Sequence, residues 1–190
     1  DLIVGTALLL LSAPLWALIW LAIRLDSKGP ALFKQQRIGE NGKPFTMYKF
    51  RTMRLDAELH QAEVSHYDED GNFIHKRAND PRVTRVGRFL RRTSLDELPN
   101  LINVLRGEMS LVGPRPEVAW MLDKYQTWQL RRFAVPQGIT GWWQINGRSS
   151  KPMHLHTEDD LYYIQNYSIW LDLRILWRTL FVVLRGIGAF

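Results

Sequence analysis

The sequence predicts a mostly α-helical α+β domain attached to an N-terminal membrane helix. Three features predict it: an uncharged apolar run at the start, two strand-like runs separated by a turn after it, and helical periodicity from Pro81 onward. With 190 residues, of which 46% are hydrophobic and 23% charged, the chain is long and apolar enough to fold. We expect residues 1–28 to form the membrane helix and residues 29–190 to form one continuous functional domain. Because the chain starts at Asp1, we expect it to be the C-terminal part of a longer protein.

The apolar run from Leu2 to Ile23 has the length of a membrane helix. About 20 apolar residues span the ~30 Å hydrocarbon core of a bilayer. The run lacks the basic leading region of a signal peptide, and Arg24 and Lys28 behind it predict that the downstream chain lies in the cytosol. Pro14 predicts a kink, and the Ser12 hydroxyl is placed to bind a carbonyl that the kink frees. The run by itself fits a kinked spanning helix or a helix that bends and returns to the same face.

A β-hairpin is expected next. The runs Leu32–Ile38 and Phe45–Phe50 have strand character, and Gly39, Asn41 and Gly42 between them are turn formers. This hairpin supplies the β part of the predicted α+β fold.

The later segments predict helices. We expect a short helix over Met53–Glu63 and an amphipathic helix over Glu117–Phe133. The segment Ile169–Leu184 is nearly continuously apolar but carries charges, which predicts an amphipathic helix lying in the membrane interface. Eight tryptophans favour the same placement, since tryptophan is enriched where a bilayer meets water.

Charge favours a partner that carries phosphate. The formal net charge is +6, which suits nucleic acid, nucleotide substrates or anionic lipid without choosing among them. There is no cysteine, which excludes a disulfide scaffold, a thiol nucleophile and cysteine-based zinc sites. Arginines at helical spacing predict one strongly basic helix face, formed by Arg82, Arg85, Arg88, Arg91 and Arg92.

The segment that is richest in potential chemistry reads RFLRRTSLDELPNLINVLRGEMSLVGPRPE. Ser94 and Glu97 match a capping box, and Pro99 would move the helix start to about Leu98. In both cases Asp96 and Glu97 lie at a helix N-terminus, where the dipole favours an ionised carboxylate. An ionised carboxylate is what an attack on phosphorus requires. Capping alone also accounts for an acidic pair at this position.

Basic residues on both sides of this acidic pair favour catalysis. Arg91 and Arg92 precede it, and Arg115 follows within a rigid Gly-Pro-Arg-Pro loop. Arginine binds phosphate oxygens in a fork geometry. A nucleophilic carboxylate with basic groups beside it is the minimum set for phosphoryl transfer.

The order of the motifs identifies a family. The chain resembles the bacterial sugar transferases, the polyprenyl-phosphate phosphoglycosyl transferases with a monotopic membrane domain. The resemblance covers nearly the whole chain. It includes the apolar segment broken by proline and, in order, GPALFKQQRIGENGKPFTMYKFRTM, DPRVTRVGRFLRRTSLDELPNLINVLRGEMSLVGPRPE, GITGWWQINGR and DDLYYIQNYSIWLDLRILWRTL.

The resemblance implies a ping-pong mechanism with Asp96 as the nucleophile. Asp96 would attack a UDP-sugar, release UMP and keep the sugar phosphate until polyprenyl (undecaprenyl) phosphate accepts it. It also implies Mg²⁺ near Asp96 as metal ligand, with Glu97 in metal or proton handling. By position in the family motifs, the phosphate-holding residues are Lys49, Arg51, Arg91 and Arg115.

The same resemblance implies a re-entrant helix whose two ends both lie in the cytosol. The family bends at a Ser-Pro pair, whereas here Ala13 precedes Pro14 and Ser12 stands one position earlier. The implied location is the bacterial inner membrane, among its lipids, with the active site facing the cytosol. The implied role is the first membrane step of exopolysaccharide, capsule, O-antigen or glycoprotein glycan assembly. No nucleic acid partner is expected, and the sequence leaves a homodimer open.

Other interpretations rank lower. A membrane-anchored basic protein could bind nucleic acid or anionic lipid without catalysis, but the Asp96-Glu97 pair would repel a phosphate backbone. Asp68 and Asp70 resemble the metal-binding pair of Rossmann-like glycosyltransferases, which need alternating strands and helices before it, so a solvated turn is preferred. His154 and His156 lack a third metal ligand, and we expect them in a solvated loop.

Overall fold

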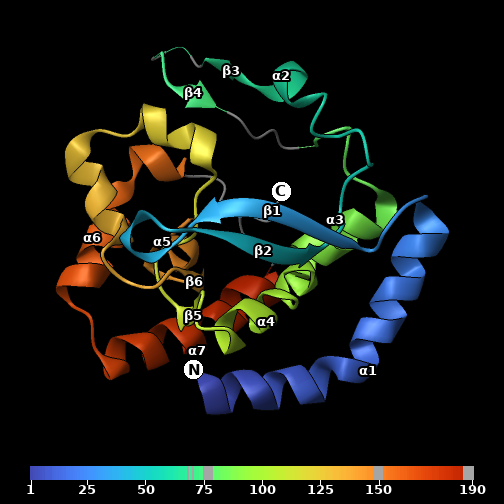
Figure 1. Ribbon diagram of the computed structural model, residues 1–190, viewed down its shortest axis with the longest axis horizontal. Coiled ribbons are helices and arrows are strands. Elements are labelled where there is room, and N and C mark those ends of the chain that lie inside the picture. The colour runs from blue at the N-terminus through green and yellow to red at the C-terminus, as the bar shows by residue number, and fades with distance from the viewer. Residues whose placement is uncertain (68, 70, 75–78, 148–151, 186–190) are drawn as a thin grey trace.

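The computed structural model describes residues 1–67, 69, 71–74, 79–147 and 152–185, and the expected turn at Asp68 and Asp70 lies outside them. A β-hairpin lies near the middle of the molecule with helices around it (Figure 1). The helices are α1 (Leu2–Asp26), α2 (Gln61–Val64), α3 (Arg85–Thr93), α4 (Asn100–Leu105), α5 (Trp142–Ile145), α6 (Thr157–Gln165) and α7 (Ile169–Arg185). The strands are β1 (Leu32–Ile38), β2 (Pro44–Phe50), β3 (His66–Tyr67), β4 (Phe73–Ile74), β5 (Ser110–Val112) and β6 (Gly138–Thr140). Single 3₁₀ turns or short 3₁₀ helices are η1 (Glu40–Gly42), η2 (Leu95–Glu97), η3 (Ala119–Lys124), η4 (Thr127–Phe133) and η6 (Met153–Leu155).

The predicted mostly helical α+β class is therefore confirmed. The described strands form three two-stranded sheets, of which β1–β2 and β3–β4 are antiparallel and β5–β6 is parallel. The strand bounds of β1 agree with the prediction, and β2 begins one residue earlier, at Pro44. The turn between them uses Asn41 and Gly42 at φ 55° and 73°, a left-handed region that asparagine and glycine tolerate best.

Helix α1 is long, apolar and bent. It has 25 residues with Pro14 inside, and Figure 1 shows it changing direction part-way along its length. Proline removes a backbone donor from a helix interior, which accounts for a bend. The Ser12 hydroxyl donates to the Leu9 carbonyl at 3.2 Å and accepts from Trp16 Nε1 at 3.0 Å. The predicted partner of Ser12 differs in the structure: the hydroxyl binds the Leu9 carbonyl, whereas the carbonyl that Pro14 deprives of its helical donor is that of Leu10.

Most of α1 is not covered by the rest of the chain. Its most apolar 18-residue window has a mean hydropathy of 2.3, and only 11% of that window is buried. Among the described helices it alone is long and apolar enough to cross a membrane, by length and composition. Ile19 and Ile23, in its C-terminal half, pack against Ala31, Phe50 and Leu90. This contact joins α1 to the rest of the domain through the hairpin and α3. The re-entrant path of α1 through a membrane stays a prediction.

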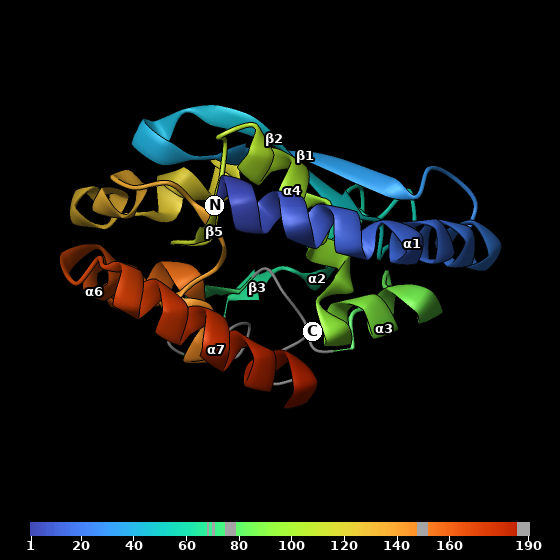
Figure 2. The ribbon, with the colours of Figure 1, turned by 90° about the horizontal axis from the view of Figure 1, so that it is seen from below.

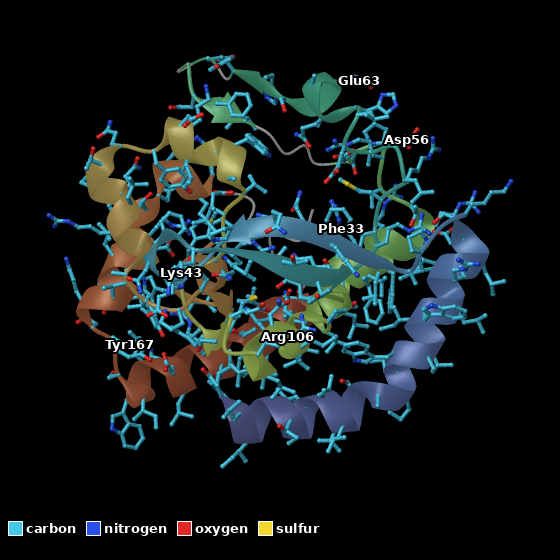
Figure 3. All side chains as sticks on the ribbon, viewed as in Figure 1. Phe33, Lys43, Asp56, Glu63, Arg106 and Tyr167 are labelled. Carbon is cyan, nitrogen blue, oxygen red and sulfur yellow. The ribbon has the colours of Figure 1, made fainter. Side chains whose placement is uncertain are left out.

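The main core lies between the hairpin, α4, β5 and α7. Its buried members include Met47, Leu101, Val112 and Ile175. Figure 3 shows Arg106, at the end of α4, beside β2, where its guanidinium donates to Tyr48 Oη at 2.9 Å. The core thus ties the hairpin to the segment that follows the acidic pair.

Two predicted helices are wrong in extent. Within Met53–Glu63 the structure has turns, and α2 begins only at Gln61. The Glu117–Phe133 segment forms η3 and η4 instead of one helix, because the backbone at Tyr125 and Gln126 is extended. A capping box between the Gln126 and Gln129 side chains starts the second of them.

The predicted capping box at Ser94 and Glu97 is also wrong. Ser94 has a left-handed backbone (φ 55°) and its side chain caps no helix, so it ends α3 instead of starting a helix. The acidic pair lies on η2, and α4 begins only at Asn100, after Pro99. Asp96 and Glu97 therefore lie on a separate turn between two helices.

The basic face is smaller than predicted. Arg82 precedes α3 and is buried, with its guanidinium bound to the Asp80 carboxylate at 2.6–3.2 Å. Arg85, Arg88 and Arg92 remain as exposed residues of α3. His154, expected in a solvated loop, is 6% exposed because η6 packs into the domain.

Candidate active site

The predicted site residues meet at a cavity of about 350 Å³. Figure 3 marks Phe33 on β1 and Asp56 and Glu63 on the segment that follows β2, and residues from both of these parts line the cavity. Aromatic and apolar side chains such as Phe33, Phe73 and Trp120 form part of its wall. The charged part of the lining includes Arg37, Lys49, Arg51, Arg91, Asp96, Glu97, Arg115 and Glu117.

The two neighbouring carboxylates on η2 have different surroundings. Glu97 Oε1 accepts hydrogen bonds from Lys49 Nζ at 2.9 Å and from an Arg115 terminal nitrogen at 2.8 Å. Asp96 is 8% exposed, and none of the described residues makes a hydrogen bond or ion pair with its carboxylate. Glu97 is therefore occupied in holding two cations, while Asp96 is left available to a ligand in the cavity.

Electrostatics separates the two carboxyl groups further. Burial would raise the pKa of Glu97, but Arg115 and Lys49 outweigh it and hold that pKa well below its ordinary value. Burial raises the pKa of Asp96, Lys49 opposes that shift, and the Glu97 charge adds to it. The sequence-based expectation that a helix dipole keeps Asp96 ionised does not describe this environment. Cations beside Asp96 are what would favour its charged form.

Lys49 reaches the dyad from the hairpin. It lies on β2 opposite Phe33, so both side chains point to the same face of the hairpin. Burial and the nearby Arg115 lower the pKa of Lys49 to about 8, although Glu97 and Asp96 raise it. Lys49 is thus a cation at neutral pH that loses its charge in mildly alkaline solution.

Arg115 is held by the backbone of its own loop. The Gly113 amide donates to the Thr140 carbonyl at 2.9 Å, and the Gly138 amide donates to the Pro114 carbonyl at 2.8 Å. A side chain on Gly138 would collide with the Gly113 backbone, which is why this approach requires glycine. These two hydrogen bonds hold the loop against β6, and its rigidity stays a prediction.

A fully buried ion pair supports the same loop from behind. Arg132 and Asp160 lie 2.7 Å apart, with their side chains 0% and 1% exposed. The Arg132 guanidinium also donates to the Arg115 carbonyl at 2.8 Å. The pair therefore fixes the backbone from which the Arg115 side chain reaches Glu97.

Arg91 reaches the cavity because α3 packs tightly on the segment that follows β2. A side chain on Gly87 would collide with the Thr52 carbonyl, so only glycine permits this contact. The Thr84 side chain caps α3 by accepting from the Gly87 amide at 3.0 Å. Arg91 Nε then donates to Thr52 Oγ1 at 3.0 Å, which fixes the arginine near Asp96.

Arg51 and the bend residues have other surroundings. The Arg51 guanidinium donates to the carbonyls of Ser27 and Lys28 at 3.0 and 2.8 Å, at the end of α1. Those bonds link the end of α1 to the end of the hairpin, so contact of Arg51 with phosphate stays a prediction. Ser12 and Pro14 lie within α1 and are not part of the cavity lining.

The sequence-based prediction missed several cavity residues, among them Arg37, Glu117 and Gln144. Phe33, Gln35 and Arg37 are alternate residues of β1, and all three line the cavity. Because alternate side chains of a strand point to the same face, this pattern could have identified Arg37 from the sequence. The Arg37 guanidinium binds the Pro116 carbonyl at 3.2 Å. Glu117 and Gln144 lie within family motifs, but their burial depends on tertiary packing that no local pattern reveals.

The residues fit a hard divalent cation held in part by substrate. Among the described residues there is no group of at least three histidine, cysteine or acidic side chains that could hold a metal. Mg²⁺ commonly binds through one or two carboxylates together with phosphate oxygens. An available Asp96 carboxylate at the cavity suits that mode.

Comparison with known proteins gives the family. The model of the bacterial sugar transferase family matches residues 1–186, and the chain belongs to this family. The family resemblance of the sequence motifs is thereby confirmed.

Several relatives are named for related reactions with different sugars. The undecaprenyl-phosphate galactose phosphotransferase of Salmonella typhimurium is 39% identical, over 100% of this chain and 40% of that protein. The UDP-glucose:undecaprenyl-phosphate glucose-1-phosphate transferase of Escherichia coli is 42% identical, over 95% of this chain and 38% of that protein. An Aeromonas hydrophila protein named for UDP-N-acetylgalactosamine is 37% identical, over 100% of this chain and 44% of that protein. This chain therefore spans less than half the length of these relatives.

Proposed function

We propose that this chain carries the catalytic apparatus of a phosphoglycosyl transferase that moves a sugar-1-phosphate from a UDP-sugar to undecaprenyl phosphate. One observation carries the proposal. Asp96 lies at a cavity, and its carboxylate makes no hydrogen bond or ion pair within the described part of the chain, while its neighbour Glu97 is held by Lys49 and Arg115. Relatives named for galactose, glucose and N-acetylgalactosamine support the reaction class and leave the sugar open.

In the first half-reaction Asp96 is the nucleophile. A carboxylate oxygen attacks the β-phosphorus of the UDP-sugar, the bond from that phosphorus to the bridging oxygen breaks, and UMP leaves. Arg91 and Arg115 lie near Asp96 and offer guanidinium groups to the phosphate oxygens, whose charge grows as the bond breaks. Lys49 adds a third positive group and also keeps Glu97 in place.

In the second half-reaction the lipid phosphate takes the sugar phosphate. An oxygen of the undecaprenyl phosphate attacks the phosphorus of the intermediate, the bond to Asp96 breaks, and the carboxylate is restored. The product is undecaprenyl diphosphate sugar, and no proton transfer is needed because the acceptor enters as an anion.

Mg²⁺ fits this scheme with Asp96 as its protein ligand. When bound, it would neutralise the charge of the diphosphate. The Glu97 carboxylate binds both Lys49 and Arg115 and so keeps both cations oriented toward the cavity. We therefore assign Glu97 a positioning role.

The exposed apolar helices suit a site at the surface of the inner membrane, facing the cytosol. The N-terminal half of α1 lies along the lower edge of Figure 1 with α7 beside it, and both helices face the viewer in Figure 2. On α7 the exposed fractions are 78% for Trp170, 63% for Trp177 and 84% for Leu184. Many apolar residues of α1 are exposed as well. Such surface on amphipathic and apolar helices favours burial in lipid. A re-entrant α1 would place a water-soluble donor and a lipid acceptor within reach of one cavity.

The non-catalytic interpretation finds less support. Arg37, Lys49 and Arg115 line a cavity together with the carboxyl groups of Asp96 and Glu97, whose negative charge would repel a nucleic acid backbone. Of the expected basic face, only Arg85, Arg88 and Arg92 remain exposed, which suits anionic lipid headgroups.

A substrate screen tests the proposal. Detergent-purified protein is incubated with Mg²⁺, undecaprenyl phosphate and one UDP-sugar at a time, and UMP is measured. Release of UMP with one sugar and formation of a lipid-linked product are expected. Absence of UMP with every sugar would contradict the proposed activity and favour a binding protein.

A further inference from the structure

A second, smaller cavity adjoins the dyad on the side of α7. Its volume is about 70 Å³, and it lies between η2, β6, α5 and α7. Its walls are largely apolar, with Ile139 and Ile145 on one side and Val182 and Val183 of α7 on the other. Thr179, also on α7, donates to the Ile175 carbonyl and lies 2.8 Å from the Thr140 hydroxyl, so both of these hydroxyl groups are already engaged.

Three side chains line both cavities: Glu97, Arg115 and Gln144. They therefore form the partition between the charged cavity and the apolar one. Gln144 Oε1 is buried and accepts no hydrogen bond from any described residue, while its Nε2 donates to the Ile139 carbonyl at 3.3 Å. An apolar cavity that ends at a guanidinium group is complementary to a molecule with an apolar tail and an anionic head.

The outer wall of this cavity is formed by α7. Many apolar side chains of this helix are exposed. Val182 and Val183 are partly buried, whereas Leu180, Phe181 and Leu184 beside them are 56%, 44% and 84% exposed. Figure 2 shows α7 at the surface of the molecule, with its C-terminal end approaching α3. An apolar molecule on this surface thus has a neighbouring apolar cavity that leads toward Arg115.

We propose that the second cavity receives the phosphate-proximal isoprene end of the polyprenyl phosphate acceptor. The inference rests on the proposed function and assigns the acceptor its own entry, separate from that of the UDP-sugar. The volume admits only a short part of the prenyl chain, so the remaining isoprene units lie along α7 in lipid. The phosphate is held at Arg115, from where its oxygen attacks the phosphorus carried by Asp96 and releases the carboxylate.

The two half-reactions make this assignment testable on its own. Val183→Trp fills the cavity from α7, and Val183 is not a member of the packed core. Leu130→Trp is the matched control, because it places the same side chain at an exposed position of η4 that lines neither cavity. Each protein is assayed with and without undecaprenyl phosphate in detergent micelles.

We expect Val183→Trp to release one equivalent of UMP without acceptor as the unaltered protein does. Its KM for undecaprenyl phosphate should rise about ten- to a hundredfold, the scale of an overfilled site, with an unchanged KM for the UDP-sugar. Leu130→Trp should change neither constant. An unchanged acceptor KM in a folded Val183→Trp protein, or an equal rise of both KM values, would overturn the assignment.

Two further results keep the outcome interpretable. If Val183→Trp does not fold, Val183→Leu fills less of the cavity, and the same selective rise in acceptor KM is required of it. If the unaltered protein releases no UMP with any UDP-sugar, the proposed function fails, and that failure is distinct from a failed acceptor site.

Discussion

The Arg115 guanidinium donates to the Glu97 carboxylate at 2.8 Å, and this contact joins two segments that lie 18 residues apart in the chain. This hydrogen bond orients Arg115 at the cavity. It also occupies the carboxylate of Glu97, which we do not assign as the nucleophile. The neighbouring Asp96 is thereby left as the acidic group of the pair that is available for chemistry. The predictions below follow from that division of roles.

Replacing Arg115 with alanine should weaken transfer by the ~1.5–3 kcal/mol typical of charged hydrogen bonds, or about ten- to a hundredfold in kcat/KM. The reason is that both a phosphate-binding cation and one of the two partners of Glu97 are lost. Arg115→Lys should recover only part of the loss, because an ammonium group lacks the fork geometry. Steady-state kinetics with the UDP-sugar measures kcat/KM for both variants. Wild-type constants for Arg115→Ala would mean that this residue has only a structural role.

Activity should fall as the pH rises through about 8. Lys49 has its pKa lowered to about 8, so it is positively charged below that pH and neutral above it. A neutral Lys49 neither holds the Glu97 charge nor stabilises phosphate, and kcat/KM should show a falling alkaline limb. Lys49→Arg stays charged over this range, so the limb should disappear. A limb that persists unchanged in Lys49→Arg would assign it to another group.

Breaking the buried pair behind the loop should destabilise the whole domain. Arg132→Met leaves the Asp160 carboxylate buried without its cation, which typically costs about 3–5 kcal/mol. The double variant Arg132→Met with Asp160→Leu should regain much of the loss, since no unpaired charge remains. Thermal unfolding in detergent compares the three proteins, and equal melting temperatures for the single and double variants would contradict the account.

Gly87→Ala should damage the site from a distance. A methyl group there collides with the Thr52 carbonyl, so α3 must shift and Arg91 Nε loses its bond to Thr52 Oγ1. Overpacking of this kind typically costs about 1–3 kcal/mol. A lower melting temperature together with a raised KM for the UDP-sugar is expected. Gly5→Ala is the control, because a methyl group there meets only the Leu105 and Val104 side chains at 3.5 Å, an ordinary van der Waals contact.

The sequence predicts local structure well where local chemistry determines it. The hairpin follows from alternating side chains and from turn formers such as Asn41 and Gly42, and its strands agree with the prediction to within one residue. The proline in α1 likewise predicts the bend that Figure 1 shows. The residues of the dyad and its basic neighbours came from the order of family motifs, and the structure brings Lys49, Asp96 and Arg115 together.

Features that depend on contacts distant in sequence could not be predicted. The buried Glu117 carboxylate accepts from Tyr125 Oη at 2.9 Å, and the chain between them bends into 3₁₀ turns instead of one helix. Ser94 matches a capping pattern but adopts a left-handed backbone that ends α3. Gln144 gains its position between two cavities only through packing of α5 against its neighbours.

The central claim is that Asp96 carries the sugar phosphate covalently, and intact-mass analysis tests it most directly. The protein is incubated with its UDP-sugar and Mg²⁺ without acceptor, and the modified peptide is then mapped. We predict a mass increase of one sugar phosphate on Asp96, its loss on addition of undecaprenyl phosphate, and no adduct in Asp96→Asn, whereas Glu97→Gln still forms the adduct at a lower rate. An adduct on another residue, or full transfer by Asp96→Asn, would contradict the account.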